Sequence, residues 1–146
     1  MKLLYVWIEE FRNIKQQGFI VDNEYKVSVE IPDGDSFGFY DSRGSRVLGA
    51  SSGLWRKIFY RKFSYEKNDS YCDHPGNSPI QSITALAGEN ASGKSSIIDC
   101  IHQRADQFNY QNKEGRYFLL VFLDTDHHSI VVRTRDIWLH GFEDKK

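Results

Sequence analysis

The chain of 146 residues is 40% hydrophobic and 14% aromatic, a composition that is typical of one folded globular unit and excludes an intrinsically disordered chain. Its net charge of −1 excludes the strongly basic character of a general nucleic-acid-coating protein. The charge is uneven, because seven Lys and Arg residues face only Glu66 between positions 43 and 67, which predicts a local basic surface.

The amino-terminal sequence MKLLYVWIEE contains a short apolar run that ends at Glu9 and Glu10. This run is too brief for a signal peptide or a membrane span, so we expect a cytoplasmic protein with no membrane partner. The two cysteines, Cys72 and Cys100, are far apart and lack a CxxC spacing, which predicts neither a disulfide framework nor a zinc site.

Two strands are predicted near the amino terminus. The run LLYVWI at 3–8 is apolar and β-rich, and KVSVEI at 26–31 alternates apolar and polar residues as a half-exposed strand does. The segment 32–81 is rich in glycine, serine and turn residues and predicts an irregular insertion. Within it, the aromatic and basic stretch 54–67 fits either a helix or a strand.

The second half of the chain predicts a strand, a glycine-rich loop and a helix in succession. SITALA at 82–87 has the pattern of a buried strand, and apolar residues recur at helical spacing from Ser95 to about Phe108. The apolar stripe of this helix comprises Ile97, Ile98, Ile101, Ala105 and Phe108. The run 117–134 then places two β-rich segments around a polar break at 124–128, which predicts a hairpin.

The glycine-rich loop matches the phosphate-binding pattern GxxxxGK[ST], and its strand and helix flanks are those that the pattern requires. Its amide N–H groups and the helix dipole favour phosphate oxygens. We expect ATP and Mg²⁺ as cofactors, with Lys94 at the β- and γ-phosphates, Ser95 on the metal and Ser96 on the α-phosphate side. A chance glycine-rich turn that caps a helix is the alternative. The predicted nucleotide-binding residues are Gly88, Glu89, Asn90, Ala91, Ser92, Gly93, Lys94, Ser95 and Ser96.

Three sequence motifs carry a family resemblance. WIEEFRNIK at 7–15, GENASGKSS at 88–96 and IIDCI at 97–101 resemble the amino-terminal lobe of ABC-type ATPase heads of the SMC and RecF kind, including AAA-labelled bacterial ATPases. Ala91 stands where that family has glycine. The resemblance implies an α/β fold, a P-loop NTPase amino-terminal lobe with an antiparallel β portion, with residues 1–146 forming a single nucleotide-binding lobe of an incomplete head. It also implies an anti-phage defence or DNA-repair machine.

Several parts that the resemblance implies are not found in the sequence: a glutamine loop, a signature motif, a Walker B segment and a switch histidine. The run FLLVFLD ends at Asp124 as a Walker B strand does, but Thr125 follows it in place of glutamate, and the hairpin interpretation is favoured. We therefore assign no catalytic residue. Hydrolysis needs a carboxy-terminal lobe, another protein chain or a homodimer, and the alternative function is a non-hydrolysing nucleotide sensor or a DNA-binding adaptor.

Two further groups of residues are candidates for binding. In the basic stretch, Arg56, Lys57, Arg61 and Lys62 are the candidate nucleic-acid contacts, with Trp55, Phe59, Tyr60 or Phe63 stacking on bases. The alternative is that these aromatic residues pack in the core while the cations point outward. His127 and His128, with Cys72 and His74, are a candidate metal site, against which a solvated turn is favoured.

Overall fold

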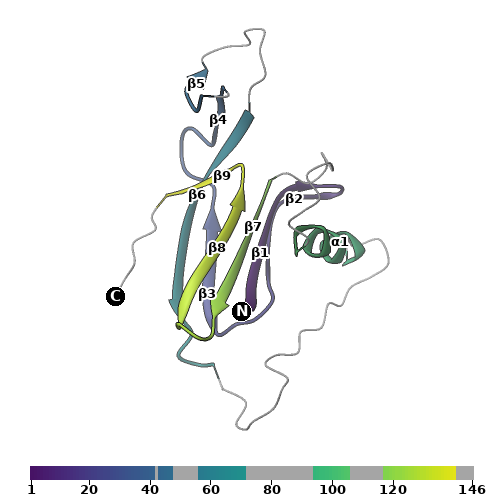
Figure 1. The fold of residues 1–146 in the computed structure, drawn as a ribbon, viewed down its shortest axis with the longest axis vertical. Helices are drawn as coiled ribbons and strands as arrows, with labels where there is room; N and C mark the ends of the chain where they lie inside the picture. Colours follow the sequence, from purple (N-terminus) through teal and green to yellow (C-terminus); the bar gives the residue numbers. More distant parts are fainter. Residues whose placement is uncertain (42, 48–55, 72–93, 106–116, 141–146) are drawn as a thin grey trace.

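The structure is a computed structural model that describes residues 1–41, 43–47, 56–71, 94–105 and 117–140, and in these ranges it has nine strands and one helix (Figure 1). The strands form two sheets. In chain order the elements are β1 (Lys2–Phe11), β2 (Ile14–Ile20), β3 (Tyr25–Glu30), β4 (Phe37–Tyr40), β5 (Arg46–Val47), β6 (Arg56–Lys67), α1 (Lys94–Ala105), β7 (Tyr117–Asp124), β8 (Ser129–Arg135) and β9 (Ile137–His140).

The first sheet is antiparallel and has the order β2-β1-β7-β8. Its central strand β1 pairs with β2 on one edge and β7 on the other, as at Trp7, which lies opposite both Gly18 and Leu119. All of 4–9 is buried. An antiparallel strand normally has one solvent-exposed face, so burial of all these side chains means that both faces of the sheet are covered here. Figure 1 shows α1 beside β1 and β2, on the far side from β3 and β6.

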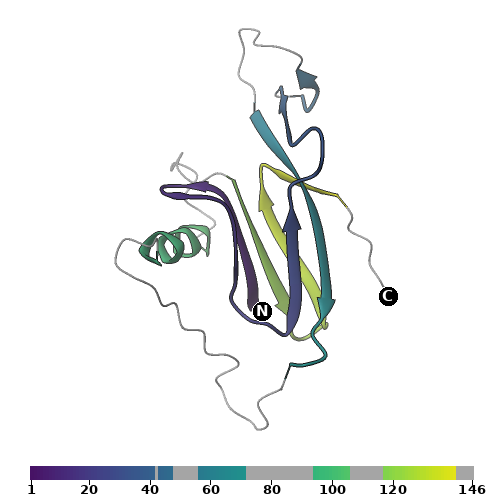
Figure 2. The same ribbon diagram turned by 180° about the vertical axis from the view of Figure 1, so that it is seen from behind.

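The second sheet is built around the long strand β6. Phe59 of β6 pairs with Phe37 of β4 and with Ile137 of β9, while Lys62 pairs with Glu30 of β3 and with His140 of β9. Strands β3 and β4 therefore follow one edge of β6 in succession, and β9 follows the other edge. The β6–β9 pairing is the one parallel pairing among the described strands. In Figure 2, which views the molecule from the other side, β3 and β6 lie in front of the first sheet.

A hydrophobic core lies between the two sheets. Trp7 of β1, Leu119 and Val121 of β7, and Phe59 and Phe63 of β6 all point into it. Phe59 meets Tyr117 edge to face, with ring centroids 4.9 Å apart and an interplanar angle of 82°. The fully buried side chains here, such as Leu119 and Val121 at 0% exposure, show that the sheets are closely packed.

One ion pair is buried inside this core and joins the two sheets. Arg61 of β6 donates from Nε to Oε2 of Glu9 at 2.9 Å, and its Nη2 bonds the other carboxylate oxygen. Trp7 Nε1 donates to the same Oε2 at 3.0 Å. Arg61 Nη1 donates to the carbonyl oxygens of Ser36 at 3.0 Å and Tyr60 at 2.6 Å. Both charges are thus paired and hydrogen-bonded, which buried charges require.

Several of the sequence predictions are confirmed. Strands occupy 3–8 and most of 26–31, and β7 and β8 form the predicted hairpin. The antiparallel β portion of the expected fold is present. The described residues do not fit the predicted α/β architecture of a P-loop lobe, because they form mostly antiparallel sheets with a single helix. The predicted strand at 82–87 lies outside the described residues.

The prediction of an irregular insertion over 32–81 is wrong at 37–40 and 46–47, which form β4 and β5. The stretch that fitted either a helix or a strand is a strand, with Phe59 and Phe63 facing the core. Gly38 is a packing glycine within β4, since a Cβ there would lie 2.4 Å from the Tyr60 hydroxyl oxygen. A glycine count therefore overstated the amount of loop.

We expect Arg61→Met to lower the free energy of unfolding by about 3–5 kcal/mol, because it leaves the Glu9 carboxylate buried without a counter-charge. Urea denaturation followed by circular dichroism measures the change. The double variant Glu9→Leu with Arg61→Met should recover most of the loss. Lys26→Ala, which breaks an exposed pair with Glu66, is the control, with an effect below about 0.5 kcal/mol. An unchanged urea midpoint in Arg61→Met contradicts the prediction.

Candidate nucleotide-binding site

Helix α1 begins at Lys94, directly after the last glycine of the phosphate-binding pattern. Its first turn contains no acidic residue, so the partial positive charge of the helix start is not offset by a carboxylate there. Ser95 is exposed and Lys94 is half-buried. The predicted loop residues Gly88, Glu89, Asn90, Ala91, Ser92 and Gly93 lie outside the described residues.

The turn between β1 and β2 contacts the start of this helix. Arg12 Nη1 lies 2.6 Å from Asp99 Oδ2, and the Ser96 hydroxyl donates to Asn13 Oδ1 at 3.3 Å. Arg12 has a φ of 54°, a left-handed conformation that is uncommon for a residue with a side chain. The two-residue turn thus directs Arg12 and Asn13 toward the helix, at some backbone cost.

Packing holds α1 against the outer face of the first sheet. Ile97 is 7% exposed and belongs to a cluster with Val6 and Ile8 of β1 and Leu120 of β7. Ile101, one helical turn later, packs against the same cluster. The predicted apolar stripe is therefore confirmed at these two isoleucines.

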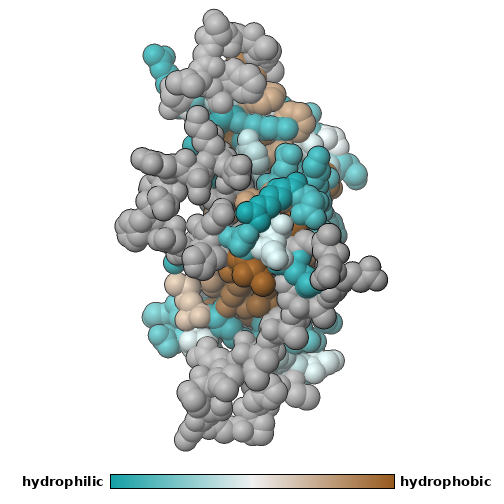
Figure 3. Space-filling view, turned by 90° about the vertical axis from the view of Figure 1, so that its right-hand side faces the viewer, coloured by the Kyte–Doolittle hydropathy of each residue, from teal (hydrophilic) through white to brown (hydrophobic). Residues whose placement is uncertain are grey.

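The prediction that Ile98 belongs to this apolar stripe is wrong, because its side chain is 58% exposed. Residues 97 and 101 share a helix face, whereas residue 98 is turned by about 100° from residue 97. Figure 3 shows the side of the molecule that carries α1, with apolar atoms gathered in the middle of the face. The apolar side chains that pack there while remaining partly exposed are Leu3, Phe19, Val21, Ile101, Phe118 and Phe122.

Asp124 ends β7 and belongs to the hairpin turn. It pairs with Ser129 across the hairpin, its Oδ1 accepts the Asp126 N–H at 3.0 Å, and its Oδ2 lies 2.8 Å from His127 Nδ1. The hydrogen bond with His127 is the main cause that lowers the pKa of the Asp124 carboxyl. The hairpin interpretation of this segment is confirmed, and Asp124 is engaged within the turn.

The two adjacent histidines lie in this turn, and both are exposed. Across the described ranges, no group of three or more His, Cys, Asp or Glu side chains is placed to hold a metal ion. Cys72 and His74, the other proposed ligands, lie outside those ranges.

The structure corrects the proposed nucleic-acid set in the basic stretch. Arg61 is fully buried on Glu9, and the Lys57 Nζ lies 4.2 Å from the centroid of the Phe37 ring on the core-side face of β6. Phe59 and Phe63 are core residues, so neither ring is available to a base. Arg56 and Lys62 remain exposed on the outer face, and Trp55 lies outside the described residues.

The contacts of Arg12 and Asn13 with α1 were missed by reasoning from sequence alone. Both residues stand inside the opening motif 7–15, so a signal was present. Nothing in the order of residues, however, indicated that this turn meets a helix more than 80 positions later, since Arg12 and Asp99 are separated by 87 residues.

Comparisons with protein-family models, curated proteins and solved structures find no match to this chain. The described residues include no helix long and apolar enough to cross a membrane. A functional proposal therefore rests on the loop motif and on the way that α1 is seated.

We expect Ile97→Ala to lower the free energy of unfolding by about 2–4 kcal/mol, because it opens a cavity between α1 and the first sheet. Ile98→Ala is a matched control of the same residue type, and it should change stability by less than about 0.5 kcal/mol. Urea denaturation of both variants gives the comparison. Equal losses in the two variants contradict the described seating of the helix.

Proposed function

We propose that this chain is the ATP-binding lobe of an ABC-type ATPase of the SMC and RecF kind, acting in the cytosol. The observation that carries the proposal is the seating of α1 on the β1–β2 turn through the Ser96–Asn13 and Arg12–Asp99 contacts. The first contact joins the opening motif to the loop motif, and the second joins it to the motif at 97–101, so all three motifs that carry the resemblance meet here.

The same contacts argue against a chance glycine-rich turn. Such a turn needs only a helix to follow it, whereas here the helix start is also fixed by side chains 83 and 87 residues away. An exposed Arg–Asp pair contributes little stability, about 0–1 kcal/mol. Its value is positional, because it holds the first turns of α1 in one orientation toward whatever the loop binds.

The described residues at the helix start suit a nucleoside triphosphate with Mg²⁺. The first-turn amide N–H groups have no partner within the helix and favour an anion. Lys94 supplies an ammonium group and Ser95 an exposed hydroxyl, which we assign to the phosphates and to the metal. Bound Mg-ATP supplies the phosphoryl group and the divalent charge. Ser96 is buried and bonded to Asn13, so we assign it to anchoring the helix start in place of the α-phosphate.

The fold class supports the proposal only in its antiparallel part. The described strands are mostly antiparallel, whereas an α/β P-loop lobe also has a central strand that leads into the loop. That strand is predicted at 82–87, outside the described ranges. The proposal thus depends on the motif and on the helix seating rather than on overall architecture.

Hydrolysis requires parts that we assign to a further lobe, another protein or a second copy of the chain. In-line attack on a phosphate needs a positioned water and stabilisation of the developing charge. Asp124 is engaged in its own turn, the first turn of α1 contains no acidic residue, and Asp99 in the second turn is paired with Arg12. The partly exposed apolar side chains beside α1 offer a surface on which such a lobe can pack. The task of the whole machine, anti-phage defence or DNA repair, follows from the resemblance alone.

We expect Lys94→Ala to weaken Mg-ATP binding about 10- to 100-fold, because it removes the charge-assisted contact to the phosphates. Isothermal titration calorimetry of the purified chain measures the affinity. Lys15→Ala, at an exposed position of β2, is the control and should bind as the wild type does. Wild-type affinity in Lys94→Ala, with an unchanged circular dichroism spectrum, overturns the assignment of the loop.

We expect the isolated chain to bind ATP without hydrolysing it at a useful rate, since a missing acid-base group alone typically costs about 10²–10⁴-fold. Phosphate release is compared among the wild type, Lys94→Ala and Asp124→Asn, each alone and with any co-purifying protein. All three should be near background when alone. Robust release by the wild type that is lost in Asp124→Asn means that Asp124 is catalytic; release only with a partner separates the ATPase from a nucleotide sensor.

A further inference from the structure

We propose that the free edge of β8 binds an extended peptide segment of a partner protein, in which apolar residues alternate with acidic ones. Such a segment adds one strand to the four of the first sheet through backbone hydrogen bonds. None of the residues assigned to ATP belongs to this edge. The inference therefore goes beyond the nucleotide site and stands independently of it.

Strand β8 has one partner among the described strands. All of its residues, Ser129–Arg135, pair with β7 in one continuous register without a bulge. The backbone N–H and C=O groups that alternate along its other edge have no described strand to pair with. Such a row of donors and acceptors is a template for one more strand.

The opposite edge of the same sheet is protected against such pairing. Strand β2 presents Lys15, Gln16 and Gln17 as consecutive exposed polar residues, and Gln16 has a left-handed φ of 47°. Charged or polar side chains and local irregularity are common means of blocking an edge strand. In β8, by contrast, consecutive aliphatic residues occupy 130–132, and all of them remain partly exposed.

The core-facing side of β8 is only partly covered. Val132 and Thr134 lie opposite Val121 and Leu119 of β7, which are both fully buried in the core between the sheets. Directly opposite residues share a face of the sheet, so Val132 and Thr134 face the same core. Val132 is nevertheless half-buried and Thr134 exposed, which shows that the space between the two sheets is open along β8.

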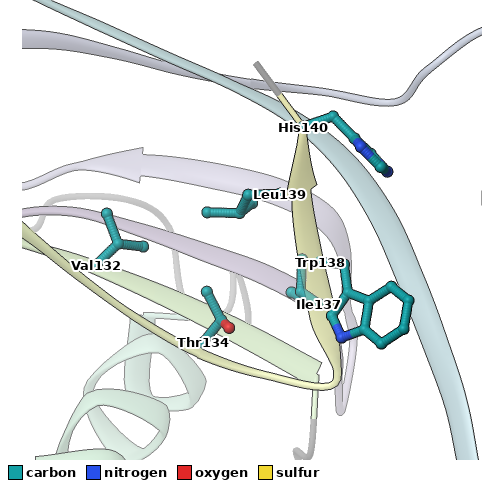
Figure 4. Close-up of a pocket in the computed structure, with 6 residues that line it drawn as sticks. All are labelled: Val132, Thr134, Ile137, Trp138, Leu139 and His140. Atoms are coloured by element: carbon teal, nitrogen blue, oxygen red, sulfur yellow. The ribbon is translucent and has the colours of Figure 1, made fainter. Parts of the chain in front are cut away.

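This opening is a groove between β8 and β9. The chain passes from β8 to β9 through Asp136, which has a left-handed φ of 55°, and the two strands diverge from this corner. Figure 4 shows Val132 and Thr134 standing on one side of β8 and Leu139 extending from β9 toward that side. Every second side chain of a strand added beside β8 points into the groove, which favours apolar residues there. The groove has a volume of about 550 Å³, and its lining residues are Val132, Thr134, Ile137, Trp138, Leu139 and His140.

The charge on the other face of β8 selects the remaining residues of the segment. Arg133 lies opposite Leu120, which packs on the α1 side of the sheet, so Arg133 faces that side as well. Arg133 is exposed, and its guanidinium lies 5.6 Å from the centroid of the Phe122 ring. No carboxylate among the described residues pairs with it, and a ring contact leaves the N–H donors of a guanidinium available. We therefore expect acidic residues to alternate with the apolar ones.

A single extended segment fits this edge better than a second copy of the chain. Figure 1 shows β9 extending past β8 on the side away from β7, and Figure 2 shows the same from behind. An identical sandwich placed edge to edge brings its own second sheet into the space that β9 occupies, whereas one added strand does not. Pairing of β8 with β8 of a second copy is accordingly an outcome that the test separates.

The test measures fluorescence anisotropy of two labelled peptides, EVEVEVE and KVKVKVK, titrated with the purified chain. Both match the length of β8 and differ from each other in charge alone. EVEVEVE should bind more tightly, because cross-strand pairs of opposite charge are favourable and pairs of like charge are not. EVEPEVE, whose central proline removes a backbone donor from the strand, should not bind.

Arg133→Glu tests the charge with an expected change of sign. It should weaken EVEVEVE and tighten KVKVKVK by about 2- to 30-fold each, because it exchanges attractive and repulsive cross-strand pairs. Lys15→Glu is the matched control, since Lys15 is an exposed cation on β2, at the opposite edge of the same sheet. It should leave both affinities unchanged.

Hydrogen exchange locates the peptide on the chain. Saturating EVEVEVE should slow amide exchange over 129–135, because amides on the free edge of β8 gain hydrogen-bond partners. Exchange over 14–20, in β2, should stay unchanged and serves as the internal control.

Several outcomes overturn the proposal. They are absence of saturable EVEVEVE binding, equal affinity for EVEVEVE and KVKVKVK, wild-type affinities in Arg133→Glu, and protection over 14–20 instead of 129–135. A wild-type chain that sediments as a dimer, with 129–135 already protected, shows that a second copy occupies the edge and also overturns it. Lys94→Ala should keep full affinity for EVEVEVE, so loss of ATP binding and loss of peptide binding are separate results.

Discussion

The buried pair of Glu9 and Arg61 decides which way the two longest strands face. Alternate residues of a strand point to opposite sides where its pairing is regular, so fixing one residue there fixes its neighbours. With Arg61 turned inward, Phe59 and Phe63 enter the core while Ile58, Tyr60 and Lys62 face outward. With Glu9 and Trp7 turned inward, Val6 and Ile8 face α1. The ion pair is thus consistent with the side to which each of these residues faces.

Such a pair is better suited to specifying an arrangement than to stabilising it. Desolvation of two charges offsets most of their attraction, so a well-packed apolar replacement is often as stable. An apolar replacement, however, lets β6 shift by two residues without leaving a charge unpaired. The bidentate contact, the Trp7 donor and the two carbonyl acceptors admit one register only.

The sequence predicted what depends on local pattern and missed what depends on tertiary partners. The hairpin at 117–134 and the helix start after Gly93 are local, and both are present. Arg61 reads as a surface cation because nothing nearby in sequence reveals a carboxylate 52 residues away. Gly38 was interpreted as a turn residue because Tyr60, whose hydroxyl leaves no room for a Cβ at position 38, belongs to another strand. Trp138 and His140 lie beside Tyr60 and Lys62 only because β9 pairs with β6, which no local sequence pattern indicated.

Strand β1 supports both α1 and the second sheet. Val6 and Ile8 contact the helix that follows the loop, and Trp7 and Glu9, their neighbours on the same strand, contact the sheet that carries β9. Closely packed interiors transmit displacements, because side chains interdigitate with few voids that could absorb them. Val6 and Ile8 thus support α1 on the strand whose Glu9 binds Arg61, and Arg61 is the residue of β6 that lies opposite Leu139 of β9. The β1–β2 turn, where Arg12 holds a left-handed conformation, is the strained segment that contacts α1.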